Sequence, residues 1–121
     1  MKHEDTMGED LRDILKKCLD PEKAEQVALW LKKRCEEEHI VFVSYAWKSL
    51  VNHITAMVNR SVTGETLDID TEVFEDVPED SLRLAQEVVN AVGKIQDEEK
   101  YLLSIHFESA KENAQKRSVN L

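Results

Sequence analysis

Residues 101–110 read YLLSIHFESA, an apolar run with helical spacing that is expected to turn mostly inward. A second run, VNHITAMVNR at residues 51–60, has the same character. Each run carries one histidine, His106 in the first and His53 in the second. Histidine is the side chain best placed to change charge, carry a proton or accept a phosphoryl group near neutral pH. The two runs therefore predict two core helices that each present a group capable of chemistry.

Two more helices are predicted on the N-terminal side of these runs. The first has apolar residues at i, i+3, i+4 and i+7, namely Leu11, Ile14, Leu15 and Cys18. Asp20-Pro21 then provides an N-cap followed by a proline at the first helical position, so a second helix begins here. Its apolar stripe consists of Ala24, Val27, Ala28, Leu31 and Cys35, and three glutamates at residues 36–38 mark its end.

Glycines mark the ends of two later helices. Gly64 suits the end of the helix that holds His53, because glycine readily adopts a positive φ. A fourth helix is expected to begin after Pro78, with Asp80 or Ser81 as its cap, and to end at Gly93. The last helix is expected from Asp97 to about Gln115 and includes His106.

Residues 40–43, with the sequence IVFV, are ambiguous. Their β-branched and aromatic side chains favour a strand, but no partner strand is evident elsewhere. We interpret them as the buried entry into the third helix, which runs to about Arg60. The residues of that helix expected to face inward are Trp47, Leu50, Val51, Ile54, Met57 and Val58.

Length and composition limit the fold class. A chain of 121 residues with 41% hydrophobic residues can bury a core without disulfides or metals. Its 3 glycines and 2 prolines favour long regular segments. We therefore expect an all-α fold, a compact bundle of about five helices, in a single domain over residues 1–121 with residues 1–6 disordered.

The charge balance limits the partners. The net charge is −9, from 25 acidic and 16 basic residues, whereas nucleic-acid binding needs clustered Lys and Arg. Direct nucleic-acid binding and binding to anionic membranes are therefore not expected. The polar N-terminus does not resemble a secretory signal, and no apolar run approaches the roughly 20 residues of a membrane span. We expect a cytoplasmic protein with Cys18 and Cys35 reduced.

The surroundings of the two histidines suggest anion chemistry. Arg60 lies two helical turns after His53, near the same face, where its paired donors could hold an anionic group on the imidazole. His106 has Ser109 at i+3 and Glu99 at i−7. Desolvation lowers the pKa of such a ring and a carboxylate raises it, so the sequence assigns no protonation state. Taken alone, each histidine is more often a structural residue hydrogen-bonded at the edge of the core.

Other site types find little support. Cys35 and His39 have a spacing that can bind a metal on a helix, but a closed zinc site needs two further ligands that no compact spacing supplies. A Cys–His nucleophile lacks a glycine-rich turn to stabilise an oxyanion, and nearby acids would raise the thiol pKa. No glycine loop is present to cradle phosphate. We therefore expect no metal, no cofactor and no enzymatic activity.

Two motifs resemble those of a known family. His53, Arg60 and Gly64, separated by seven and four residues, resemble the first motif of the PTS regulation domain (PRD) family. The segment EKYLLSIH, residues 99–106, resembles the second motif. Both motifs occur in order and at a suitable separation, and the resemblance covers roughly residues 35–115.

The resemblance implies a five-helix bundle that pairs into homodimers and regulates transcription or antitermination of sugar operons. It implies that His53 and His106 accept phosphoryl groups from the sugar phosphotransferase system (PTS), through HPr or enzyme II components, and that Arg60 contacts the phosphate. Asn52 stands where the family usually has aspartate, which removes a carboxylate that would polarise His53. A free-standing single PRD is expected, and another PRD-containing regulator is a possible partner.

Two rival interpretations stay open at this point. A histidine-phosphotransfer relay protein of two-component signalling is also an acidic helical bundle, although it usually carries an exposed histidine followed closely by Lys-Gly, which His53 lacks. The other rival is a helical dimerisation module whose histidines are structural. Its binding would survive replacement of both histidines by glutamine.

Overall fold

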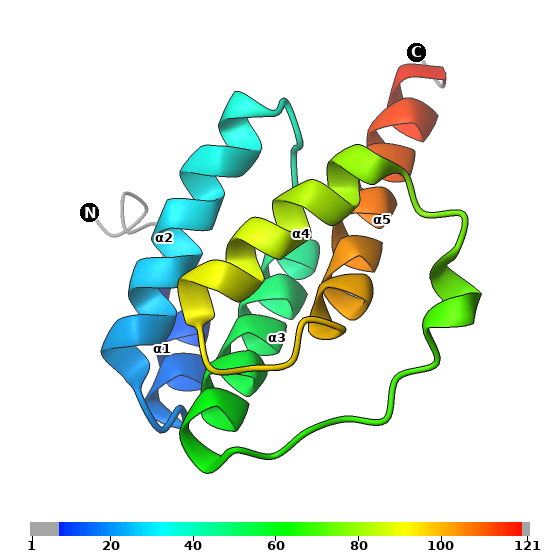
Figure 1. The fold of residues 1–121 in the computed structure, drawn as a ribbon. Helices are drawn as coiled ribbons and strands as arrows, with labels where there is room; N and C mark the ends of the chain where they lie inside the picture. Colours follow the sequence, from blue (N-terminus) through cyan, green and yellow to red (C-terminus); the bar gives the residue numbers. More distant parts are fainter. Residues whose placement is uncertain (1–7, 120–121) are drawn as a thin grey trace.

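The computed structural model describes residues 8–119, and these form a bundle of five α-helices with one short 3-10 helix (Figure 1). The elements are α1 (Gly8–Lys16), α2 (Pro21–Glu37), α3 (Ser44–Thr63), η2 (Thr71–Phe74), α4 (Glu79–Val92) and α5 (Glu99–Val119). No strand occurs within 8–119, so the all-α prediction is confirmed. The disorder expected for residues 1–6 lies outside the described residues.

Helix α3 is the centre of the bundle. It contacts α1, α2, α4 and α5, and α4 packs most extensively along α5 (Figure 1). This arrangement buries a continuous core to which every α-helix contributes. The largest fully buried apolar side chains are Phe107, Leu31, Leu50, Ile54, Met57 and Leu103. None of the helices within 8–119 combines the length and the apolar character that a membrane crossing requires.

The predicted helix ends are mostly confirmed. The Asp20 carboxylate accepts a hydrogen bond from the backbone N–H of Lys23, 3.2 Å away, and so caps α2. Gly64 follows α3 with φ 82°, and Gly93 follows α4 with φ 72°. Such positive φ values favour glycine because a Cβ would be strained there. The last helix begins at Glu99 rather than Asp97 and extends to Val119.

The expected cap of α4 was wrong. Helix α4 begins at Glu79, and Pro78 precedes it without a side-chain cap. Ser81 is buried, and its hydroxyl donates a hydrogen bond to Glu108 of α5 instead. Lys111 also donates to Ser81 Oγ, at 2.8 Å, so this end of α4 is held by α5 rather than by its own cap.

Residues 40–43 are extended and pair with no strand within the described chain. Ile40 is buried, but Val41 is 62% exposed, so the interpretation as a buried entry holds only in part. His39, with φ 61°, turns the chain out of α2, and α3 begins only at Ser44. Trp47 is partly buried rather than fully inward, because it lies at the edge of the bundle.

Side-chain contacts hold the long connection between α3 and α4 to the rest of the fold (Figure 1). The Leu67 backbone N–H donates to Gln96 Oε1 at 2.5 Å, and Gln96 Nε2 donates to the Leu67 carbonyl at 3.0 Å. Phe74 of η2 stacks on Tyr101 of α5 with ring centroids 5.7 Å apart. The connection therefore packs against the start of α5.

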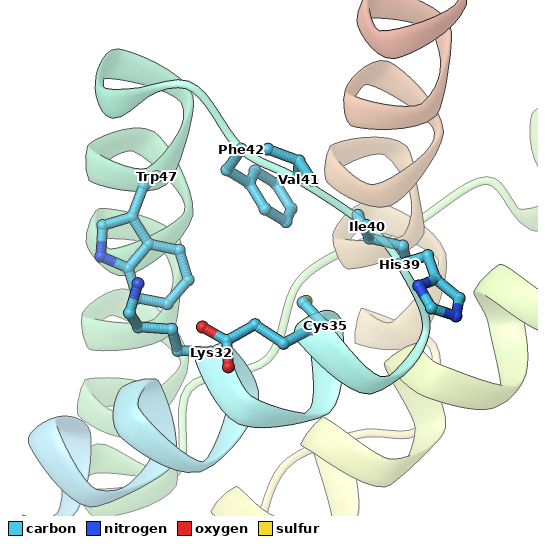
Figure 2. A pocket seen from close by; sticks show the side chains of 8 residues that line it. Lys32, Cys35, His39, Ile40, Val41, Phe42 and Trp47 are labelled. Atoms are coloured by element: carbon cyan, nitrogen blue, oxygen red, sulfur yellow. The ribbon is translucent and has the colours of Figure 1, made fainter.

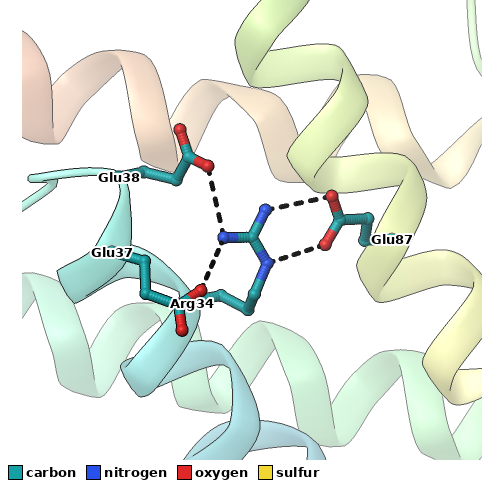
Figure 3. Close-up of polar contacts among 4 residues, drawn as sticks. All are labelled: Arg34, Glu37, Glu38 and Glu87. Atoms are coloured by element: carbon teal, nitrogen blue, oxygen red, sulfur yellow. Dashed lines mark hydrogen bonds and ion pairs between the residues drawn. The ribbon is translucent and has the colours of Figure 1, made fainter.

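An arginine near the end of α2 links it to α4. Arg34 donates two hydrogen bonds to Glu87, at 2.8 and 3.0 Å, and its Nη1 contacts Glu37 and Glu38 at 3.1 and 3.2 Å (Figure 3). Three carboxylates around one guanidinium raise the pKa of Arg34. The most prominent basic group in residues 32–34 is thus occupied by acids of the same chain.

Candidate functional site

Helices α3 and α5 bring the two predicted histidines together. The ring centroids of His53 and His106 lie 5.1 Å apart, and the ring planes are tilted by 53°. Both side chains are partly buried, and neither imidazole has a hydrogen-bond partner among the described residues. Residues 53 positions apart in sequence therefore form one site at the contact between α3 and α5.

Both imidazoles are neutral at pH 7. Burial lowers the pKa of His53 to about 4, because the charged ring loses its hydration, and the positive charges of His106 and Arg60 add to this effect. Burial also lowers the pKa of His106. A neutral imidazole keeps a lone pair on one ring nitrogen, which is the form that acts as a nucleophile or a metal ligand.

A buried ion pair lies next to the histidines. Arg60 of α3 donates from Nε and Nη2 to the two carboxylate oxygens of Glu99, both at 2.7 Å. Glu99 is fully buried and Arg60 is 15% exposed. The bidentate geometry fixes the plane of the guanidinium and raises the pKa of Arg60. This pair joins the end of α3 to the start of α5.

The pairing of Glu99 settles a question that the sequence left open. Glu99 was expected near the face of His106, where a carboxylate would raise the pKa of that ring. In the structure its carboxylate is turned to Arg60, and burial alone lowers the pKa of His106. Arg60 Nη1 forms no hydrogen bond with a described residue, so one edge of the guanidinium stays open for an anion.

The sequence contains a signal for this pairing. Arg60 follows His53 by seven residues, and Glu99 precedes His106 by seven. Where two helices meet with the histidines opposite each other and the chains antiparallel, residues two turns away in opposite directions must also meet. Sequence analysis identified all four residues but did not combine the two spacings.

A hollow of about 320 Å³ opens beside His106. Its lining residues are Phe42, Tyr45, Ala46, Ser49, Leu102, Ile105, His106, Ser109 and Asn113. Tyr45 is 73% exposed and Ile105 is 44% exposed, so apolar side chains surround the opening. These residues were not predicted as part of the site, because Tyr45 and Phe42 reach it from the turn before α3.

The cysteines do not extend the site. Cys18 and Cys35 are both buried and free. Burial raises the pKa of Cys35 to about 12, so it is a protonated thiol at neutral pH and a poor nucleophile. Across the part of the chain that the structure describes, no three His, Cys, Asp or Glu side chains gather closely enough to hold a metal.

Comparison with known proteins supplies the relationship. No protein-family model and no curated protein matches the chain. Among solved structures, the chain is similar to the crystal structure of a PRD-containing transcription regulator from Lactobacillus casei ATCC 334, with a TM-score of 0.81. The two are 33% identical, and the match covers 85% of this chain and 93% of the other. With this identity over most of both chains and the same helical fold, the chain belongs to the PRD family.

Proposed function

We propose that this protein is a non-enzymatic regulatory module that controls transcription or antitermination of a sugar operon. Its state is set by phosphorylation of His53 and His106 by the PTS, through HPr or an enzyme II component. The observation that carries the proposal is the 5.1 Å separation of two neutral imidazoles from different helices. The relationship to a PRD-containing transcription regulator supports the regulatory role.

The phosphoryl transfer needs only groups of this site and the donor. The free ring nitrogen attacks phosphorus and forms the new P–N bond while the bond between phosphorus and the donor atom breaks. The donor group leaves with that electron pair and takes up a proton, and the modified imidazole releases its remaining proton to water. The pKa of about 4 for His53 and the lowered pKa of His106 keep both acceptors unprotonated.

We expect His106 to be modified first. It lines the hollow beside Tyr45 and Ile105, which gives a donor protein access to its ring. His53 is not among the residues that line this hollow, and burial is the main cause of its low pKa. A phosphoryl group on His106 then carries about −1.5 to −2 charges, taking phosphoserine as a guide.

Arg60 is the candidate contact for this charge. Its Nε and Nη2 are held by Glu99, and Nη1 is left for a phosphoryl oxygen. Glu99 therefore acts as a positioning residue for the guanidinium. A charge-assisted hydrogen bond from a fixed donor stabilises an anion without reorganisation of the site.

Phosphorylation beside an apolar rim would change how two copies of the chain associate. Tyr45 and Ile105 are exposed next to His106, and burial of such side chains is what an interface between copies provides. A new negative charge at this place has to be met by donors or it opposes burial. Phosphorylation would therefore act as a local charge change that shifts a monomer–dimer equilibrium.

The test is incubation with phosphoenolpyruvate, enzyme I and HPr, with and without enzyme II components from the same organism. Intact mass is read at neutral pH, and sedimentation velocity reports association before and after. We expect an acid-labile adduct that is lost in His106→Ala and reduced in His53→Ala. His39→Ala is the matched control, since His39 is exposed and outside the site.

The opposite outcome is equally clear. If no donor modifies the chain while the same donors modify an established PRD in parallel, the histidines are structural and the protein is a dimerisation module. If both single variants keep the full adduct and His39→Ala loses it, the site is assigned to the wrong histidines. If association is the same with and without the adduct, phosphorylation does not control the pairing of copies.

A further inference from the structure

A second cavity, of about 410 Å³, lies between the end of α2, residues 39–42 and the first turn of α3 (Figure 2). Its volume falls within the roughly 300–1,000 Å³ that is typical of small-molecule sites. The phosphorylation site uses none of its polar groups. The cavity therefore requires its own explanation.

The walls of this cavity are largely apolar and aromatic. Phe42 and Trp47 meet edge to face, with ring centroids 6.1 Å apart and planes at 62°. Ile40 and Val41 complete the apolar wall, and Val41 is mostly exposed. Aromatic side chains with this geometry offer ring faces and edges against which another flat ring packs favourably. The walls fit a planar apolar body.

Two hydrogen-bond donors at the cavity lack an acceptor. Among the described residues, Trp47 Nε1 is the one buried side-chain polar atom without a partner. Leaving such a donor unpaired costs about 1–3 kcal/mol. Lys32 Nζ lies 5.9 Å from the centre of the Trp47 ring, and Figure 2 shows it beside the indole nitrogen. An ammonium and an N–H side by side are arranged for one shared acceptor.

We propose that this cavity binds a small amphipathic anion with a flat aromatic body. The body packs against Phe42 and Trp47, and a carboxylate or sulfonate accepts hydrogen bonds from Trp47 Nε1 and Lys32 Nζ. Glu36 also lines the cavity and opposes negative charge, which limits the ligand to a single anionic group held near Lys32. This binding is separate from phosphorylation and does not depend on it.

The test uses two probes with the same ring system and the full chain. Anilinonaphthalene sulfonate carries one anionic group, and phenylnaphthylamine lacks it. Binding is followed by NMR of the indole N–H signals, of which the two tryptophans give two, assigned with Trp30→Phe. We expect the sulfonate to shift the Trp47 signal saturably and to bind at least about tenfold more tightly than the neutral probe, as a charge-assisted hydrogen bond implies.

Three variants localise the effect. We expect Lys32→Met to weaken sulfonate binding by about tenfold and Glu36→Gln to strengthen it by about two- to threefold. Lys33→Met is the matched control, because Lys33 is adjacent but exposed and outside the cavity. Circular dichroism verifies that each variant is folded.

Each other outcome overturns the proposal. An unmoved Trp47 signal at saturating sulfonate means that the cavity is not the binding site. Equal affinity for both probes means that the two donors do not hold an anion. Equal losses in Lys32→Met and Lys33→Met mean that the probe responds only to overall charge.

Discussion

Arg34 and Arg60 each donate two parallel hydrogen bonds to a glutamate on another helix, but their surroundings differ. Arg34 binds Glu87 where both side chains are partly exposed, 22% and 35%, and two more carboxylates complete its shell (Figure 3). Arg60 binds only Glu99, which is fully buried, and it leaves Nη1 open. The same chemical pair therefore serves two different purposes.

The difference concerns what each pair costs and what it offers. Exposed ion pairs contribute little, about 0–1 kcal/mol, because water screens them and competes for their groups. A buried pair loses hydration on both partners and is not a strong source of stability by itself, yet removal of one partner leaves an uncompensated charge in the core. The Arg60–Glu99 pair is thus best explained by the orientation that it gives to a guanidinium beside His53 and His106.

The largest expected effect comes from breaking the buried pair on one side. Glu99→Ala leaves the Arg60 charge without its carboxylate and should lower the free energy of unfolding by about 3–5 kcal/mol. Urea unfolding followed by circular dichroism measures this loss. Glu87→Ala at the exposed pair is the matched control, and a loss there as large as that of Glu99→Ala would abolish the distinction.

A double variant separates stability from function. Arg60→Met with Glu99→Leu replaces the pair by apolar side chains of similar volume, so we expect stability within about 1 kcal/mol of the unmodified chain or above it. The adduct formed with PTS donors should nevertheless fall, because no donor remains to meet the phosphoryl charge. Full adduct formation in this folded variant would show that Arg60 has no part in the site.

The sequence predicted the helices far better than the contacts between them. Apolar periodicity, the Asp20-Pro21 cap and Gly64 and Gly93 are local signals, and each helix boundary that depends on them was located to within a few residues. Residues 40–43 were ambiguous because strand propensity and the lack of a partner gave opposite answers. Only tertiary packing decides that case, in favour of an extended connection without a strand.

The site was predicted in its residues and not in its geometry. His53, His106 and Arg60 were identified from spacing along the chain. The Arg60–Glu99 bond, the 5.1 Å approach of the two rings and the rim at Tyr45 depend on how α5 packs against α3. The pKa of His106 could not be assigned from sequence, because its sign depends on where the Glu99 carboxylate points.

The next effect in size is a dependence of stability on pH that the Arg34 region should lack. His53 has a pKa of about 4 in the folded chain against 6.5 unfolded, so the unfolded state binds more protons between these values. Stability is therefore fully present above pH 6.5 and decreases as the pH falls to about 4, by at most about 3 kcal/mol.

The measurement is chemical unfolding at a series of pH values for the unmodified chain and for His53→Gln. The neutral amide does not titrate, so the difference between the two chains should shrink or reverse in favour of the variant as the pH falls below 6.5. His39→Gln is the control, since His39 is exposed. Parallel pH profiles for the unmodified chain and His53→Gln would show that His53 is not held in its neutral form.

The smallest expected effect lies at the exposed pair. Arg34→Ala removes the bond to Glu87 and both weaker contacts, and we expect a loss of about 1 kcal/mol, since solvent can hydrate the three carboxylates that remain. Half a molar salt should reduce this loss, because screening acts on exposed charges, but should leave the loss in Glu99→Ala nearly unchanged. The measurement is urea unfolding of both variants at low and high salt. Because both arginines use the same bidentate geometry, an equal salt response would mean that burial does not distinguish them.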